Sequence, residues 1–168
     1  MVKVGEYPAM IAVVSAPDGR PVSLHRTYLT KHGKKAQVPE PKKLMTGLGV
    51  KGGAIRLYPA GKVLAIAEGI ETALAVHCLT GYPVWATVSA TLMQTMEVPE
   101  YVEHLLIFAD NDVPDQNGRR AGQEAAEILK SRLEKKGIKV TVVLPSKPGT
   151  DFADVWNERL SKGQKIAA

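Results

Sequence analysis

The chain has 168 residues, of which 45% are hydrophobic and 23% charged, and it contains one cysteine. This composition is typical of a globular domain with an appendage, and a single cysteine excludes a disulfide framework and a cysteine-based zinc site. No apolar run approaches the ~18 residues of a membrane span, and the first residues lack the apolar core of a signal peptide. We therefore expect a cytoplasmic protein with no membrane partner.

The net charge of +5 is unevenly distributed along the chain. Residues 1–62 contain 11 Lys/Arg against 3 Asp/Glu, a net charge of +8, whereas residues 63–168 contain 11 against 14, a net charge of −3. A basic front half indicates an anionic partner, although solubility alone would also account for it.

The basic front half begins with a predicted β-hairpin over residues 8–29, two strand-like runs joined by a Pro-Asp-Gly turn. His25 and Arg26 lie on its second strand, where an exposed face of the ribbon is preferred to a ligand role. Residues 30–53 contain six lysines and few large apolar residues, which predicts a mobile basic loop. Lys51 and the two glycines after it lead into a short strand, and such a turn permits a close backbone approach to a phosphate. A plain turn is the favoured interpretation.

From residue 62 onward, apolar strands alternate with amphipathic helices. The predicted strands cover 63–67, 83–88, 104–109 and 138–144, and the predicted helices cover 70–79, 89–96, 119–136 and 152–160. This alternation predicts an α/β fold with a parallel four-stranded sheet and helices on both faces. We expect a basic hairpin and loop region at 1–61, packed on an α/β domain at 62–161 and followed by a tail at 162–168.

Polar residues follow each predicted strand of the α/β domain, and these strand ends share one edge of a parallel sheet. They are Glu68 after the first strand, Ser89 and Thr91 after the second, Asp110 and Asp112 after the third, and Asp151 and Asp154 after the fourth. Asp110 and Asp112 are two residues apart, so in extended chain they point to the same side. Carboxylates gathered in this way repel one another unless a cation lies between them, and oxygen ligands suit Mg²⁺ or Mn²⁺.

Each of these residues also has an ordinary structural interpretation. Glu68 in the first turn of a helix is favoured by the helix dipole, Asp151 is a good helix N-cap, and Asp110 with Asp112 could form a solvated turn. Taken singly, the structural interpretations of Glu68 and Asp151 are preferred. Taken together, four or five carboxylates on one edge favour a metal site.

Three features resemble the Toprim domain, which is shared by bacterial-type primases, topoisomerases and some nucleases. They are Glu68-Gly69 after one apolar strand, Asp110-x-Asp112 after another, and a helix that starts between Gly118 and Gly122. The resemblance covers residues 62–160. The order of PDGRPVSLHRTYL, PKKLM, VKGGAIRL, AEGIETALA and GTDFAD is similar to the Toprim region of primases of phages and plasmids.

The resemblance implies roles for individual residues. Glu68 would be the general acid or base of nucleotidyl transfer and would form the catalytic set with Asp110 and Asp112. The implied ligands of Mg²⁺ or Mn²⁺ are Glu68, Asp110, Asp112, Asp151 and Asp154. Lys51 and Arg56 would lie near incoming phosphates, and the other basic residues expected to bind nucleotide or nucleic acid are Lys34, Lys35, Lys42, Lys43 and Arg119.

The favoured function is therefore the catalytic module of a DNA primase, which makes RNA primers on single-stranded DNA from nucleoside triphosphates. A helicase or the remainder of a longer primase would be a further partner. A Toprim nuclease and a non-catalytic DNA-binding or assembly module are the alternatives, and a topoisomerase is disfavoured because no tyrosine lies in the context of a nucleophile. Primases of this group usually carry a cysteine-rich zinc module and an upstream catalytic subdomain, and neither is found in this sequence. We expect the isolated chain to be an incomplete primase.

Overall fold

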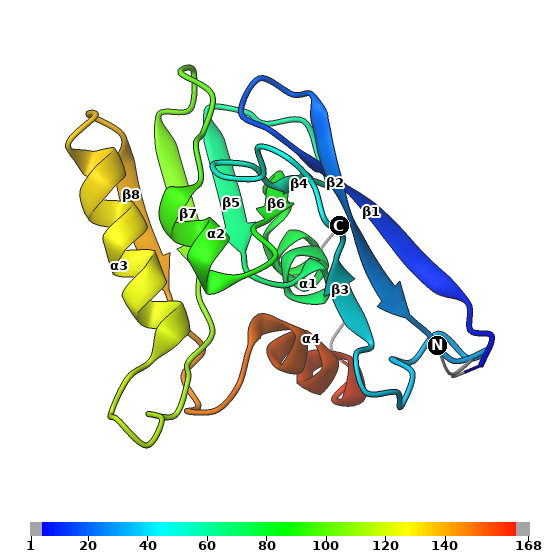
Figure 1. Ribbon diagram of the computed structural model, residues 1–168. Coiled ribbons are helices and arrows are strands. Elements are labelled where there is room, and N and C mark those ends of the chain that lie inside the picture. The colour runs from blue at the N-terminus through cyan, green and yellow to red at the C-terminus, as the bar shows by residue number, and fades with distance from the viewer. Residues whose placement is uncertain (1–4, 164–168) are drawn as a thin grey trace.

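The computed structural model describes residues 5–163, which form two β-sheets and four helices (Figure 1). Residues 164–168 of the predicted tail lie outside the described part of the chain. No helix in that part is long and apolar enough to cross a membrane.

The first sheet is antiparallel and has the order β1-β2-β3. β1 (Ala9–Ser15) and β2 (Pro21–Tyr28) are the predicted hairpin. β3 (Lys42–Leu44) comes from the segment predicted to be a mobile loop, and that prediction is wrong for these residues. They pair with the central part of β2, so the outer edge of the hairpin supplies backbone partners that the sequence pattern did not reveal.

The second sheet has five strands in the order β4-β6-β5-β7-β8. The four predicted strands are all present and parallel: β5 (Val63–Ala67), β6 (Val84–Ala86), β7 (His104–Phe108) and β8 (Lys139–Val143). β4 (Ile55–Arg56) adds an antiparallel strand beside β6, so the sheet is mixed. The predicted α/β fold class is confirmed, with one short strand added from the front half of the chain.

Helices cover both faces of this sheet, as predicted. They are α1 (Ile70–Thr80), α2 (Ala90–Thr95), α3 (Ala121–Glu134) and α4 (Phe152–Ser161). α1 and α4 pack together on one face, and α2 and α3 pack together on the other (Figure 1).

The two faces of the sheet build two hydrophobic cores, because successive side chains of a strand point in opposite directions. On β5, Leu64 and Ile66 join the core under α2 and α3, whereas Ala65 and Ala67 join the core under α1 and α4. Val14 of β1 is fully buried in this second core. The first sheet therefore packs on the same side as α1.

A backbone bridge and the burial of one face of β2 place the first sheet against the rest of the molecule. Ser15 and Ala54 exchange two backbone hydrogen bonds of 3.0 Å, which join the end of β1 to the start of β4. His25 on β2 is only 7% exposed, so the expected exposed position of this residue is wrong. The inner face of β2 is covered by the rest of the molecule.

Candidate active site

The parallel strands are connected so that a crevice is expected beside β5. The chain leaves β5 through α1 to β6 on one side and later reaches β7 on the other side. In open α/β sheets, ligands bind at the carboxyl ends of the strands where the connections diverge in this way. Glu68 directly follows β5, and Asp110 lies two residues beyond the end of β7. These two carboxylates therefore lie at the switch point.

The pKa of Asp110 is the most strongly shifted among the carboxylates of the site. This pKa is raised to about 7, first by burial and then by the nearby charges of Asp151, Glu68 and Asp112, against the opposing effect of Lys42. The Oδ1 atom of Asp110 is buried and has no hydrogen-bond partner among the described residues. A buried carboxylate oxygen without a donor is costly, and such a group in a cleft is a candidate for a functional site.

Glu68 is half-buried beside Asp110. Burial raises its pKa, the charge of Asp112 raises it further, and Lys42 lowers it. The Glu68 carbonyl accepts a 2.9 Å hydrogen bond from the N–H of Val88. Val88 has a φ of 71°, which is rare for a β-branched residue, and strain of this kind is concentrated at functional sites.

Asp112 is held by the first turn of α3. Its Oδ2 accepts a 2.9 Å hydrogen bond from the N–H of Gly122. A Cβ atom at position 122 would lie only 2.9 Å from the same oxygen. The glycine thus permits the close approach of the carboxylate to the backbone.

Asp151 and Asp154 form a capping box at the start of α4. The Asp151 side chain accepts from the N–H of Asp154 at 2.9 Å, and the Asp154 side chain accepts from the N–H of Asp151 at 3.1 Å. The hydroxyl of Thr72, a buried residue of α1, donates to the other oxygen of Asp151 at 3.1 Å. The N-cap interpretation of Asp151 is therefore confirmed, and the same carboxylate lies close enough to Asp110 to raise its pKa.

A cavity of about 320 Å³ lies between these acidic segments. It is lined by residues 110–113 of the β7–α3 loop and by Gly149, Thr150, Asp151 and Asp154 before and within α4. Asn111 ties its two walls together: its backbone N–H donates to Thr150 and its side chain donates to the carbonyl of Pro145, at 3.0 and 2.9 Å. The cavity therefore has two anchored loops as walls and acidic side chains inside.

The donor set of this cavity fits a divalent cation that prefers oxygen ligands. A cation would offset both the free-energy cost of burying the charged carboxylates and their mutual repulsion. The Oδ1 atom of Asp110, which has no hydrogen-bond partner among the described residues, is available as a ligand. Among residues 5–163, however, no three His, Cys, Asp or Glu side chains are placed to share one ion. Oxygens of Asp112 and Asp151 are engaged by backbone N–H groups, so shared coordination by three carboxylates requires side-chain rotation.

Lys42 is a basic residue that the fold brings to the carboxylates at the ends of the parallel strands. We call these carboxylates the acidic edge, and they are Glu68, Asp110, Asp112, Asp151 and Asp154. The Lys42 ammonium group forms a 2.8 Å ion pair with Glu71 in the first turn of α1. It also lowers the pKa of both Glu68 and Asp110. Lys35 lies close enough to lower the pKa of Glu71.

The other basic residues of the predicted set lie elsewhere or are engaged. Lys51 lies in a turn on the side of the sheet where the parallel strands begin. The carbonyl of the next residue, Gly52, accepts a hydrogen bond from the N–H of Glu97 there. The Arg56 guanidinium donates to the carbonyls of Ala16 and Pro17 at 2.8 Å and lies over the ring of Trp85 at 4.6 Å.

Of the three other basic residues of the set, Lys43 lies on β3, and Lys34 and Arg119 lie on loops. Lys43 pairs with Glu40 at 3.2 Å, and Arg119 pairs with Glu124 at 3.0 Å. Lys34 is exposed in the β2–β3 connection. The structure thus brings Lys42 and Lys35 toward the carboxylates and separates Lys51 from them.

Sequence reasoning missed Glu71, Thr72, Val88 and Asn111 as parts of this site. Glu71 and Thr72 follow Glu68 within one helical turn, and a polar pair there was the available signal. Asn111 lies between Asp110 and Asp112, and the sequence motif includes only those two carboxylates. No sequence signal reveals the positive φ of Val88, because branched residues rarely adopt it.

Comparison with known families supports this description of the fold. The model of the Toprim domain family matches residues 63–162, and a second model, described as a domain of unknown function, matches residues 2–57. Comparison with curated proteins gives no match.

Solved structures of DNA primases share the fold at low sequence identity. A DNA primase domain from Pseudomonas aeruginosa has a TM-score of 0.58 and 17% identity, over 92% of this chain and 50% of that one. The E. coli primase catalytic core has a TM-score of 0.59 and 14% identity, over 90% and 48%. A DnaG primase catalytic domain bound to single-stranded DNA has a TM-score of 0.58 and 13% identity, over 89% and 48%.

The chain thus spans about half the length of these primase structures, and similarity at this identity establishes the fold alone. The family model is the stronger finding, since it matches more than half of the chain and includes every residue of the acidic edge. It confirms the resemblance seen in the sequence. This chain belongs to the Toprim domain family.

Proposed function

We propose that the chain carries the metal-dependent nucleotidyl-transfer site of a DNA primase, which builds RNA primers on single-stranded DNA. The observation that carries the proposal is the meeting of Glu68, Asp110 and Asp112 at the switch point of a Toprim sheet whose fold is that of DNA primases. One similar primase structure is bound to single-stranded DNA, and we propose the same substrate here, with nucleoside triphosphates as the second substrate.

Each acidic residue has a role in this proposal. Asp110 and Asp112 hold Mg²⁺ or Mn²⁺, with Asp151 or Asp154 as a further ligand. The bound cation supplies charge neutralisation at the phosphates, which is the main requirement of phosphoryl transfer. Glu68 accepts the proton of the attacking 3′-hydroxyl as that oxygen bonds to the α-phosphorus and pyrophosphate leaves.

The proposal is tested by combining metal binding with product analysis. Isothermal titration of Mg²⁺ or Mn²⁺ should show binding to the wild-type chain and its loss in the Asp110→Asn, Asp112→Asn double variant. Unchanged binding in the double variant would remove these residues from the metal site. The metal measurement does not depend on whether the chain alone forms a complete polymerase.

The product assay uses single-stranded DNA, labelled nucleoside triphosphates and the same metals. We expect weak primer synthesis by the isolated chain. Positioning of template, primer end and nucleotide supplies much of the rate, and the acidic edge with the first sheet provides only two walls of a binding groove, which hold these substrates incompletely. Glu68→Gln should abolish the product while leaving the thermal denaturation curve unchanged. Cleavage of the DNA in place of synthesis would identify a Toprim nuclease.

A further inference from the structure

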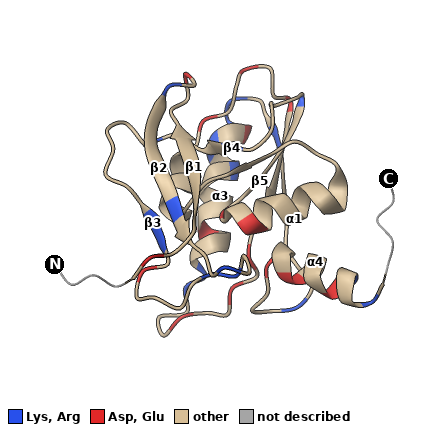
Figure 2. Ribbon diagram, turned by 90° about the vertical axis from the view of Figure 1, so that its right-hand side faces the viewer, with Lys and Arg blue, Asp and Glu red and all other residues tan. Residues whose placement is uncertain are grey.

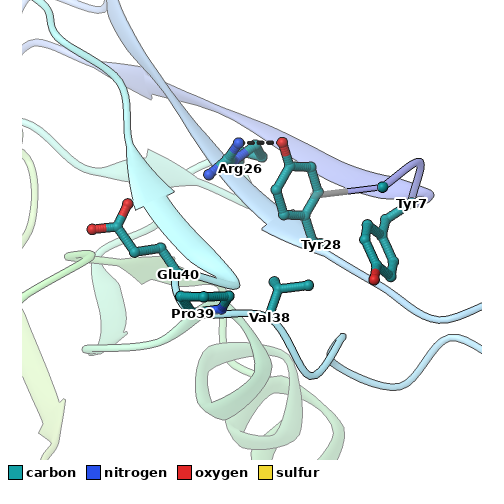
Figure 3. Close-up of a pocket in the computed structure, with 7 residues that line it drawn as sticks. Tyr7, Arg26, Tyr28, Val38, Pro39 and Glu40 are labelled. Atoms are coloured by element: carbon teal, nitrogen blue, oxygen red, sulfur yellow. Dashed lines mark hydrogen bonds between the residues drawn. The ribbon is translucent and has the colours of Figure 1, made fainter. Parts of the chain in front are cut away.

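A second cavity, of about 460 Å³, lies at the first sheet and shares no lining residue with the acidic cavity. Its walls come from the segment before β1, from β2 and from the loop before β3 (Figure 3). The residues used below are Tyr7, Arg26, Tyr28, Val38, Pro39 and Glu40. The volume lies in the range of small-molecule sites, about 300–1,000 Å³.

The polar wall of this cavity is an arginine stacked on a tyrosine. The Arg26 guanidinium carbon lies 3.9 Å from the ring centroid of Tyr28, and the guanidinium also donates to the Tyr28 hydroxyl. The Nε of Arg26 is buried and has no hydrogen-bond partner among the described residues. The Tyr7 ring lies 6.0 Å from the Tyr28 ring at 41°, so the two rings are not stacked face to face. Figure 3 shows Tyr28 between Arg26 and Tyr7.

Backbone hydrogen bonds fix the three walls to one another. The N–H of Leu29 donates to Pro8 at 2.8 Å, which holds the segment before β1 against β2. The N–H of Tyr28 donates to Pro41 at 2.7 Å, and its carbonyl accepts from Ala36 at 2.9 Å, so the β2–β3 connection is held on both sides. The cavity is therefore formed before any ligand binds, which lowers the ordering cost of binding.

The chemistry of the walls selects a flat heteroaromatic ligand. Aromatic rings and a guanidinium plane bind such ligands by stacking, Val38 and Pro39 add apolar contact, and the Glu40 carboxylate and Arg26 offer an acceptor and donors for the edge of a base. We propose that this cavity binds a single unpaired nucleobase. Stacking of successive bases on aromatic side chains is a common mode of single-strand recognition.

The position of β3 connects this cavity to the acidic edge. β3 is the edge strand of the first sheet, and Lys42 and Lys43 are consecutive on it, so their side chains point to opposite faces. Lys42 pairs with Glu71 beside the carboxylates, whereas Lys43 pairs with Glu40 of the cavity. A single-stranded nucleic acid whose phosphates contact both lysines would reach both the cavity and the acidic edge. This inference rests on the proposed action on nucleic acid.

The nucleobase can belong to a single-stranded DNA or to a free nucleoside triphosphate, and one experiment separates these sources. An oligonucleotide about ten nucleotides long, within the range of single-strand site sizes, carries 5-iododeoxyuridine and is photo-cross-linked to the chain without metal. We expect mass spectrometry to place the cross-link on Tyr7 or Tyr28. Loss of the cross-link on addition of a mixture of nucleoside triphosphates assigns the cavity to the free nucleotide, and its persistence assigns the cavity to the DNA strand.

Affinity measurements by fluorescence anisotropy give a second readout. Tyr28→Leu and, separately, Tyr7→Leu should weaken binding of the probe that forms the cross-link about five- to tenfold, as expected for the loss of one stacked base. Tyr7 precedes β1 and is 39% exposed, so its variant keeps the test valid if Tyr28→Leu does not fold. The matched control is Tyr101→Leu, since Tyr101 is 59% exposed in the turn before β7, and this variant should bind like the wild type.

Three results would overturn the inference. They are cross-links confined to other residues, unchanged affinity in both tyrosine variants, and an equal loss of affinity toward an oligonucleotide of abasic residues, which has no base to stack. The assay needs no metal or catalysis, so its failure differs from failure of the proposed function. Nucleotidyl transfer without a cross-link here would contradict this inference alone, and a base-dependent cross-link without metal-dependent activity would contradict the proposed function alone.

Discussion

At the scale of single residues, the carboxylates of the acidic edge are stabilised to different degrees. Asp112 accepts a backbone N–H and Asp151 accepts both a backbone N–H and a hydroxyl. Asp110 has a buried oxygen without a partner among the described residues, and its pKa is raised to about 7. No hydrogen bond from the described residues to this oxygen offsets the free-energy cost of ionising Asp110. We therefore propose that a cation binds beside it.

Gly122 is expected to control the position of Asp112. Gly122→Ala places a Cβ 2.9 Å from the Asp112 carboxylate and should weaken Mg²⁺ or Mn²⁺ binding about tenfold, the effect usual for groups that orient a ligand. Stability should change little, because alanine favours the helix. Isothermal titration and thermal denaturation measure the two effects.

Gly118→Ala is the matched control for this prediction. Gly118 has a φ of +76° with nothing within 4 Å of an added Cβ, so alanine there should cost about 1 kcal/mol of stability through backbone strain. Metal affinity should stay unchanged. Equal metal affinity in both variants would show that the Asp112–Gly122 contact does not position a ligand.

His25 is expected to make stability dependent on pH. Burial lowers its pKa below the ordinary 6.5, the charge of Lys42 lowers it further, and Glu71 opposes this effect. As pH falls below about 6.5, the unfolded chain binds a proton that the buried ring resists, so the His25 contribution is present above that pH and is lost as pH falls toward the folded pKa. Urea denaturation at pH 7.5 and pH 5.5 should show a smaller loss in His25→Leu than in the wild type, by about 1 kcal/mol or less. An identical pH dependence would mean that folding does not lower the pKa of His25.

At the scale of elements, the start of α4 is a helix cap that also lines the acidic cavity. The capping box satisfies N–H groups at the helix start, and Thr72 links it to α1. The edge-to-face contact of Phe108 and Phe152, with ring centroids 4.9 Å apart, holds the first turn of α4 against β7. The position of Asp151 beside Asp110 thus follows from the packing of α4.

Two substitutions at Asp151 separate these functions. Asparagine is as good an N-cap as aspartate, so Asp151→Asn should keep the stability of the wild type while the loss of charge weakens metal binding. Asp151→Ala should weaken metal binding and also cost about 1 kcal/mol of stability. Titration of Mg²⁺ or Mn²⁺ and urea denaturation are measured on both variants. Wild-type metal affinity in Asp151→Asn would leave Asp151 as a cap alone.

At the scale of the whole molecule, the fold separates the basic residues of segment 1–62 in space. Figure 2 shows basic residues on β2 and β3 and acidic residues at the start of α1 and on α4. Pairing of β3 with β2 carries Lys42 to the acidic edge, whereas Lys51 lies near Glu97 on the side where the parallel strands begin. The basic residues of segment 1–62, which carries a net charge of +8, are therefore not gathered at one place on the molecule.

This arrangement predicts unequal effects of neutralising two lysines. Lys42→Gln should weaken single-stranded DNA binding and reduce the slope of log affinity against log salt by about 0.7, the value for one phosphate contact. Lys51→Gln, with the same change of charge, should leave both quantities near the wild-type values. Anisotropy titrations over a series of salt concentrations decide the matter, and equal effects of the two variants would show that only net charge matters.

The parallel strands, their helices and the carboxylates that follow the strands can all be predicted from the amino-acid sequence. Their signals are local: the apolar run 105–109 is short and is followed by Asp, Asn and Pro, which predicts a buried strand, and the residue that ends a parallel strand lies at a known edge. Asp151 was likewise recognised as a cap from its position before an amphipathic helix. Each of these inferences needs only neighbours in the chain.

Which side chains contact one another depends on how the elements pack, and local sequence patterns do not reveal it. β3 was missed because three residues rich in lysine become a strand only when the edge of β2 supplies hydrogen-bond partners. The sequence pattern predicts an exposed His25, which is buried in the structure, because period-two alternation does not say which face of the hairpin is covered. The pairing of Lys42 with Glu71, and the stacking of Arg26 on Tyr28 in a cavity closed by the loop before β3, depend on segments that are distant in sequence. Local patterns fix elements, whereas burial and ionic contacts between elements depend on how those elements pack.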